Sequence, residues 1–233
     1  MRTNTDINIP ILILMKQRNT VPELTLDFHA HILPGCDHGS DCVETSLKQL
    51  EMAVSAGVKT ICATPHFYPH KKSLESFLKR REESAKALIE RLPENAPQIL
   101  LGAEVLICDG LEHLEGLPRL CREGTNELLL EMPFYDWPES IWDTLYMLCD
   151  RSDIQIVLAH ADRYPRADIE RLIHDGIPLQ LNAVCLTKPL QRRHYLSWIE
   201  SGYVKYIGSD IHMLGEGYRD FEKCRKLLEK KLG

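Results

Sequence analysis

The sequence predicts an α/β protein built on parallel strands, and three observations support this. From residue 24 onward, short runs rich in aliphatic and β-branched residues alternate with stretches of helical periodicity. Most of the runs are apolar on both faces, as expected of strands that helices cover on either side. The chain has 233 residues, a length that a single α/β barrel fits.

Seven runs are candidate strands, and six stretches between them have helical spacing. The strands are expected at 24–28, 58–64, 98–105, 126–132, 154–160, 177–182 and 204–210, and the helices at 43–56, 73–92, 138–149, 167–174, 189–200 and 218–232. Gly57, Gly176 and Gly202 each precede a strand, where a helix stop is expected. We therefore expect one domain over 22–233, preceded by a loose N-terminal extension over 1–21.

Composition and charge exclude several classes of protein. The net charge of −6 leaves no uniform basic field for a nucleic acid. The longest apolar run, 9–15, is far shorter than the roughly 20 residues that span a bilayer, and it makes a poor signal peptide. Eight cysteines without C-x-x-C spacing are typical of reduced thiols, and none is followed by the arginine of a cysteine-dependent phosphatase loop. We expect a cytoplasmic enzyme.

Histidine and carboxylate residues gather where the predicted strands end. In a parallel barrel the carboxyl ends of the strands form one face, so residues distant in sequence meet there. His29 and His31 alternate along one strand and therefore point the same way. A single histidine at a strand end is more often an ordinary core or surface residue, but six of the ten histidines lie at or just after strand ends. Together with carboxylates they predict a site for zinc, manganese or iron.

Two glutamates at strand ends, Glu104 and Glu131, extend this prediction. A carboxylate has two oxygens and can bridge neighbouring divalent ions. Two or more ions are therefore expected.

Six blocks in a fixed order, DFHAHILPGCDHG, ATPHFYP, GAEV, LLEMPF, LAHADRY and SDIH, resemble the polymerase and histidinol phosphatase (PHP) superfamily. The resemblance runs from about Asp27 to the C-terminus. Within the superfamily, the chain is most similar to the bacterial tyrosine phosphatases of capsule and exopolysaccharide operons, the CpsB/CapC type. This resemblance implies a distorted seven-stranded, TIM-like β/α barrel. It also implies a site for two to three divalent ions, most often manganese, with zinc or iron as alternatives.

The resemblance also assigns ligands by position. It implies His29, His31, Glu104 and Asp210 for a first ion, Glu104, Glu131 and His160 for a second, and His38, His66 and His212 for a third. The family usually has Asp-Asp-Gly where this chain has Asp37-His38-Gly39, and an imidazole there favours later transition metals. Arg163 resembles the family's phosphate-binding, catalytic arginine. Arg219 resembles a second such arginine, although it follows the SDIH block later than usual.

The implied activity is metal-assisted hydrolysis of a phosphomonoester without a covalent enzyme intermediate. The expected substrate is a phosphotyrosine protein, namely the C-terminal tail of a bacterial tyrosine autokinase in capsule regulation. A histidinol-phosphatase-like enzyme for small molecules and a catalytically silent binding module are the alternatives. An amidohydrolase is disfavoured because no strand-end lysine is available to bridge two ions.

Tyr68, Phe67 and Phe134 follow strand ends and either form an aromatic rim or pack as ordinary loop residues. The oligomeric state is left open.

Overall fold

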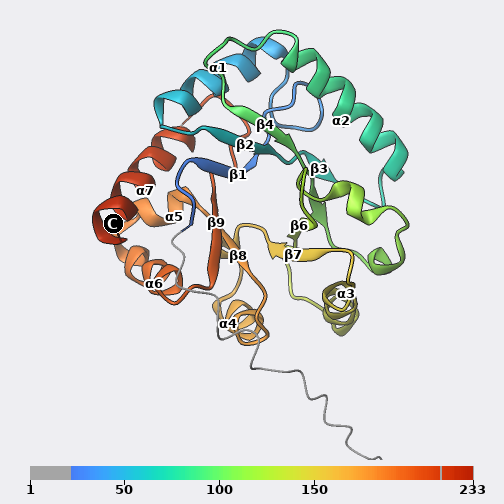
Figure 1. Cartoon of the computed structure of the whole chain (residues 1–233). Helices are drawn as coiled ribbons and strands as arrows, with labels where there is room; N and C mark the ends of the chain where they lie inside the picture. The colour runs from blue at the N-terminus through green and yellow to red at the C-terminus, as the bar shows by residue number, and fades with distance from the viewer. Residues whose placement is uncertain (1–21, 216, 233) are drawn as a thin grey trace, which may run out of the picture.

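The computed structural model describes residues 22–215 and 217–232, so the expected extension over 1–21 lies outside the described residues. It is an α/β fold with parallel strands in the middle and helices around the outside (Figure 1). The strands are β1 Leu26–Ala30, β2 Thr60–Ala63, β3 His66–Phe67, β4 Gln98–Leu101, β5 Glu104–Leu106, β6 Glu127–Glu131, β7 Gln155–Leu158, β8 Leu179–Asn182 and β9 Val204–Gly208.

The described strands form two sheets, in the orders β1-β2-β4 and β3-β5-β6-β7-β8-β9, with every neighbouring pair parallel. The prediction of seven strands is therefore wrong in number, because residues 22–215 and 217–232 contain nine. The chain turns out of the first sheet at Thr64–Pro65 and again at Gly102–Ala103, so the 98–105 run divides into β4 and β5, and β3 follows β2 as a new strand. Pro65 has no N–H to donate to a ladder, which explains the first break.

The two sheets are joined by the continuous chain on one side and by backbone hydrogen bonds on the other. At the breaks, the Gly102 N–H donates to the Ala63 carbonyl (2.9 Å), which extends the β2–β4 pairing, and the Glu104 N–H donates to the Pro65 carbonyl (3.2 Å), which extends the β3–β5 pairing. Beyond β1 and β9, the His31 N–H donates to the Ile211 carbonyl (2.9 Å), and the Asp210 N–H donates to the His29 carbonyl (2.7 Å). The carboxyl ends of β1 and β9 are thereby held together.

The helices lie close to the predicted positions. They are α1 Val43–Ser55, α2 Leu74–Ile89, α3 Glu139–Cys149, α4 Arg166–His174, α5 Ala183–Thr187, α6 Pro189–Glu200 and α7 Gly217–Leu232, with short 3-10 turns that include η4 Ala161–Arg163. Ser73 caps α2, because its hydroxyl accepts from the Ser76 N–H (3.3 Å). The short helix α5 was not expected from the sequence. In the described part of the chain, no helix has both the length and the apolar character to cross a membrane.

Two buried apolar layers support the strands. A large layer packs the helices onto the strands. A small separate cluster consists of Leu26, Phe28, Leu129, Val157 and Ala159, with Tyr206 against it. The rings of Phe28 and Tyr206 stack at 3.8 Å between centroids. Along β6, Glu127, Leu129 and Glu131 alternate and so share one face, which places a buried glutamate on either side of this apolar cluster.

Candidate metal centre

Most of the predicted ligands converge on a single cluster from positions at or next to six strands. His29 and His31 come from the end of β1, His66 begins β3, Glu104 begins β5 and Glu131 ends β6, while His160 follows β7 and Asp210 and His212 follow β9. Two of these residues have positive φ angles, His160 (29°) and Asp210 (53°), which non-glycine residues rarely adopt. Such strain persists only where the surroundings enforce it, and it is concentrated at functional sites.

Glu104 is the centre of the cluster and is almost fully buried. Its Oε2 lies 3.2 Å from His29 Nε2, 3.2 Å from His31 Nε2 and 2.9 Å from His66 Nδ1, and its Oε1 lies 2.8 Å from His160 Nε2. Despite these short distances, neither Glu104 Oε2 nor His66 Nδ1 has a partner with hydrogen-bond geometry among the described residues. Buried polar atoms are rarely left in this state. Glu104 Oε2 and His66 Nδ1 thus lie close together without a hydrogen bond between them.

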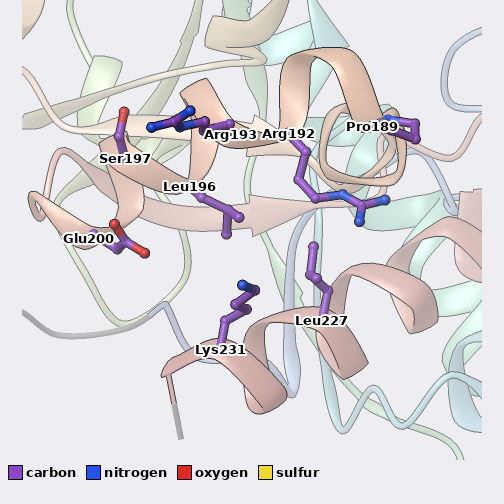
Figure 2. Close-up of a pocket in the computed structure, with 8 residues that line it drawn as sticks. All are labelled: Pro189, Arg192, Arg193, Leu196, Ser197, Glu200, Leu227 and Lys231. Atoms are coloured by element: carbon purple, nitrogen blue, oxygen red, sulfur yellow. The ribbon is translucent and has the colours of Figure 1, made fainter.

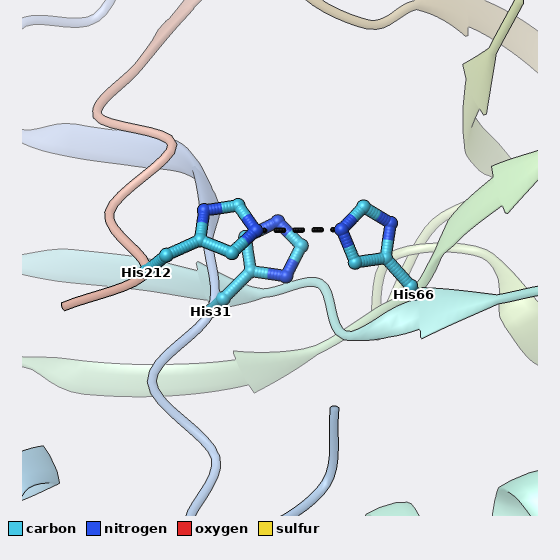
Figure 3. Close-up of side chains that lie close together, drawn as sticks. All are labelled: His31, His66 and His212. Atoms are coloured by element: carbon cyan, nitrogen blue, oxygen red, sulfur yellow. Dashed lines mark hydrogen bonds between the residues drawn. The ribbon is translucent and has the colours of Figure 1, made fainter. Parts of the chain in front are cut away.

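The part of the chain that the structure describes contains three groups of three possible ligands. Within each group, the ligand atoms lie no more than 4.8 Å from one another, a separation that one ion can span. They are His29 with His31 and Asp210, His66 with Glu104 and Glu131, and His31 with His66 and His212. Figure 3 shows the last group, in which rings from three separate segments face each other and the Nε2 atoms of His66 and His212 are 3.3 Å apart. The residue types and spacing fit divalent metal ions.

This grouping differs in part from the one that the resemblance implies. His66 lies with the two glutamates, while His160 contacts the same pair from the other side, with Nε2 3.7 Å from Glu131 Oε1. His38 is exposed, and its ring stacks on those of His66 and His212 at 4.6 Å from each. It therefore lies at the open edge of the cluster rather than inside it.

The electrostatics of the cluster show a shortage of positive charge around Glu131. Burial and the neighbouring Glu104 carboxylate raise the pKa of Glu131 to about 8. Burial acts on Glu104 in the same direction, but the charge of His29 and the hydrogen bond from His160 outweigh it and hold the pKa of Glu104 well below its usual range. Two adjacent buried carboxylates resist ionising together unless a cation is supplied, and a divalent ion would be the largest local charge.

The imidazole rings are oriented by residues that the sequence analysis did not select. Asp37 Oδ2 lies 2.7 Å from His31 Nδ1 and also accepts from the His66 N–H at 2.9 Å. Gln180 Oε1 lies 3.1 Å from His29 Nδ1 and accepts from the His160 N–H at 2.7 Å. With Nδ1–H donating to these oxygens, both Nε2 atoms present lone pairs, which is the arrangement that metal-binding histidines use. Gln180, a polar residue inside an otherwise apolar predicted strand, was the available sequence signal.

The two predicted arginines differ in position. Arg163, in η4, is ion-paired with Asp210 Oδ2 and its side chain is 44 % exposed. Burial would raise the pKa of Asp210, but the charges of His29, His31 and Arg163 lower it. Arg219 lies exposed in the first turn of α7, and its participation in the site stays a prediction.

The three aromatic residues considered for a rim differ in their surroundings. Phe67 is buried and packs against Phe77, with centroids 5.0 Å apart, so it belongs to the core. The Tyr68 ring stacks on His66 at 5.2 Å. Phe134 stacks on His160 at 5.6 Å and is 63 % exposed. Tyr68 and Phe134 thus lie next to the cluster on different histidines.

A groove of about 620 Å³ lies elsewhere, between α6 and α7 (Figure 2). It is lined by Pro189, Arg192, Arg193, Leu196, Ser197, Glu200, Leu227 and Lys231. Arg192 is engaged there by the Leu186 and Thr187 carbonyls. None of the lining residues belongs to the histidine and carboxylate cluster.

Fold and site together define an α/β protein with a histidine and carboxylate cluster suited to divalent ions at the carboxyl ends of its strands. The family model described as capsular polysaccharide synthesis, CpsB/CapC, matches residues 25–233. The chain therefore belongs to the CpsB/CapC family.

Curated relatives and a solved structure agree with this assignment. The chain is 27 % identical to the tyrosine-protein phosphatase YwqE of Bacillus subtilis, covering 89 % of this chain and 85 % of YwqE. It is 26 % identical to the tyrosine-protein phosphatase CpsB of Streptococcus agalactiae, covering 86 % of this chain and 92 % of CpsB. It also resembles a chain from the crystal structures of YwqE from Bacillus subtilis and CpsB from Streptococcus pneumoniae, described as unique metal-dependent tyrosine phosphatases. That match has a TM-score of 0.73 and 24 % identity, and covers 89 % of this chain and 87 % of the other.

Proposed function

We propose that this protein is a metal-dependent phosphomonoesterase that removes phosphate from phosphotyrosine in a protein involved in capsular polysaccharide synthesis. One observation carries the proposal: four histidine nitrogens converge on the buried Glu104 carboxylate within 3.2 Å, and its Oε2 makes no hydrogen bond among the described residues. Family membership and the names of the relatives, both tyrosine-protein phosphatases, supply the substrate class.

The proposed ligands are those named from the sequence: His29, His31 and Asp210 with Glu104 would hold one ion, Glu131 and His160 with Glu104 a second, and His38, His66 and His212 a third. The grouping of His31 with His66 and His212 makes His31 an alternative to His38 at the third site. Manganese is the proposed metal, in two to three sites, with zinc or iron as alternatives. Bound divalent ions would activate water and stabilise the charge of both the attacking and the leaving oxygen.

The chain's own residues have separate tasks in this proposal. The Arg163 guanidinium, now on Asp210, is exposed enough to turn its other N–H groups to the phosphate oxygens, which its planar fork matches. Asp37 and Gln180 keep the imidazoles of His31 and His29 turned toward the ions. The leaving group is a phenolate, whose conjugate acid has a pKa of about 10, so it needs less protonation than an alkoxide.

The proposal extends to architecture and partner. The two sheets are joined by the continuous chain at the β2–β3 and β4–β5 breaks and by hydrogen bonds at the ends of β1 and β9, and they would act as one distorted barrel within a domain over 22–233. The proposed substrate is the C-terminal tail of a tyrosine autokinase. A flexible tail can bring a phosphotyrosine to a site at the strand ends without rearranging the fold.

The test is phosphatase activity on a phosphotyrosine peptide after chelation and re-addition of manganese. A His29→Ala, His31→Ala double variant is the control. Activity that returns with manganese in the wild type and is absent from the variant supports the proposal. Rapid turnover of histidinol phosphate without turnover of the peptide would contradict the substrate class. Metal binding without turnover of any phosphoester would indicate a silent module.

A further inference from the structure

Exposed apolar side chains are concentrated beside the candidate metal centre. In the described part of the chain, eight large hydrophobic side chains are exposed, and four of them lie in two loops. Phe134 and Tyr135 follow Glu131, and Met213 and Leu214 follow His212. Apolar side chains that remain in water beside a polar cluster gain little from folding and mark a binding surface.

Phe134 is held in a defined position although it is 63 % exposed. Its ring stacks on His160, with centroids 5.6 Å apart and planes inclined by 24°, and on Tyr164 at 5.7 Å and 27°. Tyr164 is buried, and its hydroxyl accepts from the Met132 N–H (2.9 Å) and donates to the Met132 carbonyl (3.1 Å). Tyr164 thereby ties the loop after β6 to the loop after β7.

A second aromatic residue supports the same loop. The Trp137 ring meets Tyr164 edge-on at 5.4 Å, and its Nε1–H donates to the Pro133 carbonyl at 2.8 Å. The position of the Phe134 ring is therefore set before any ligand arrives. A preset ring loses little entropy on binding, which favours its use as a contact.

Phe134 and Arg163 both contact His160. Arg163 is three residues beyond His160, and its N–H donates to the His160 carbonyl at 2.9 Å. Phe134 therefore stacks on His160, the residue whose carbonyl accepts a hydrogen bond from Arg163, the proposed phosphate-binding arginine. If a substrate's phosphate is held between the cluster and Arg163, the ring of Phe134 lies beside the organic group to which the phosphate is attached.

Tyr68, which stacks on His66, has less of its ring available. It stacks on His66 at 5.2 Å, its centroid is 6.1 Å from that of His70, and the Lys71 ammonium lies 4.5 Å from it. Those contacts occupy ring surface that a ligand would need. Phe134 is thus the better candidate for contact with an aromatic substrate.

We propose that Phe134 is a specificity-determining residue whose exposed face stacks on the phenyl ring of the substrate while the cluster and Arg163 hold the phosphate. This inference rests on the proposed phosphotyrosine activity and names the contact that distinguishes an aryl ester from an alkyl ester. Aromatic pairs of this kind change affinity by about three- to tenfold.

The experiment compares Phe134→Ala, Phe134→Leu and Phe134→Tyr with Met147→Ala, which removes a half-exposed apolar side chain of α3. Calorimetry on the manganese-loaded protein measures binding of phenylphosphonate and methylphosphonate, neither of which is hydrolysed. Kinetics on a phosphotyrosine peptide gives KM and kcat. Phe134→Ala is expected to weaken phenylphosphonate and raise KM by about three- to tenfold, with kcat and methylphosphonate affinity unchanged. Phe134→Tyr should retain wild-type values, Phe134→Leu should fall between, and Met147→Ala should change nothing.

Equal weakening of both phosphonates, or no change in either, would overturn the inference and leave the proposed function standing if the wild type hydrolyses the peptide. Loss of phenyl selectivity in Phe134→Ala with no wild-type peptide turnover would support the stacking contact but refute the phosphotyrosine protein as substrate. A wild type that binds methylphosphonate as tightly as phenylphosphonate would refute the inference outright.

Discussion

Strand β6 begins and ends with a buried glutamate, and the surroundings of the two carboxylates are opposite. Glu127 and Glu131 share one face of the strand and are 5 % and 6 % exposed. At the amino end, Glu127 receives Arg122 Nη2 at 2.6 Å, Lys205 Nζ at 2.6 Å and the Tyr206 hydroxyl at 2.8 Å. At the carboxyl end, Glu131 faces Glu104 and histidines.

The pKa values of the two carboxyls follow these surroundings. Burial acts to raise both. At Glu127 the hydrogen bonds from Lys205, Arg122 and Tyr206 outweigh burial and lower the pKa, whereas at Glu131 the adjacent Glu104 adds to burial and raises it to about 8. The same residue type is thus neutralised by the protein's own cations at one end and left short of positive charge at the other. This contrast separates a structural ion pair from the proposed metal site.

The largest effect is expected from exchanging Glu131 for glutamine, with Glu127→Gln as a matched control. Glu131→Gln removes one proposed metal ligand and should lower kcat/KM on a phosphotyrosine peptide by at least about a thousandfold. Glu127→Gln should leave kcat/KM within about twofold, because the apolar cluster separates it from the site. Equal losses of kcat/KM in the two variants would contradict the assignment of different roles to Glu127 and Glu131 at the two ends of β6.

Arg163→Lys should produce the next largest effect, a loss of about ten- to a hundredfold in kcat/KM. Lysine keeps the charge but loses the planar fork that two phosphate oxygens need. Arg122, at the other end, is already committed to Glu127 through Nε and Nη2. Arg122→Lys should therefore lower stability and leave kcat/KM unchanged. Steady-state kinetics and thermal unfolding on both variants would separate these roles, and unchanged kcat/KM in Arg163→Lys would argue against phosphate binding.

Glu127→Gln should lower the free energy of unfolding by about 2 kcal/mol, since it leaves two cations without their carboxylate. Arg122 and Lys205 are partly exposed and regain water, which limits the cost. In metal-free protein, Glu131→Gln should not lower stability, because glutamine replaces a carboxyl group whose ionisation burial and Glu104 already oppose. Urea unfolding of both chelated variants tests this. If Glu131→Gln lowered stability more than Glu127→Gln does, the protein's own cations would already neutralise the charge of Glu131 at the carboxyl end of β6.

The smallest effect expected is a difference in pH dependence. The pKa of Glu127 is lowered from its ordinary value of 4.5, so its stabilisation is complete above that value and is lost as the pH falls through the folded-state pKa. The difference in unfolding free energy between wild type and Glu127→Gln should therefore be constant near neutral pH and shrink below about pH 4.5. A difference that stays constant down to pH 3 would show that the carboxylate charge does not account for it.

Much of the site was predictable because polar residues at the ends of buried strands are conspicuous. His29 and His31 are separated from Glu104 and Asp210 by long stretches of sequence, yet the rule that parallel strand ends share one face brings them together. The helix bounds followed from periodicity and glycine stops.

The rest depends on contacts that sequence patterns do not encode. The break before β3 requires the backbone geometry around Pro65, and the orientation of His31 by Asp37 requires a loop to fold back over the cluster. Gln180 contacts both His29 and His160 only because β8 lies beside their strands. The exposed position of His38 likewise follows from the loop path.

The most direct test of the central claim is a calorimetric titration of manganese into chelator-treated wild type, Glu131→Gln and Glu127→Gln. The account predicts that wild type and Glu127→Gln bind manganese with equal affinity and stoichiometry, while Glu131→Gln binds fewer ions or binds them at least about tenfold more weakly. Equal binding by all three proteins, or no binding by the wild type, would contradict the assignment of the carboxyl-end cluster as a metal centre.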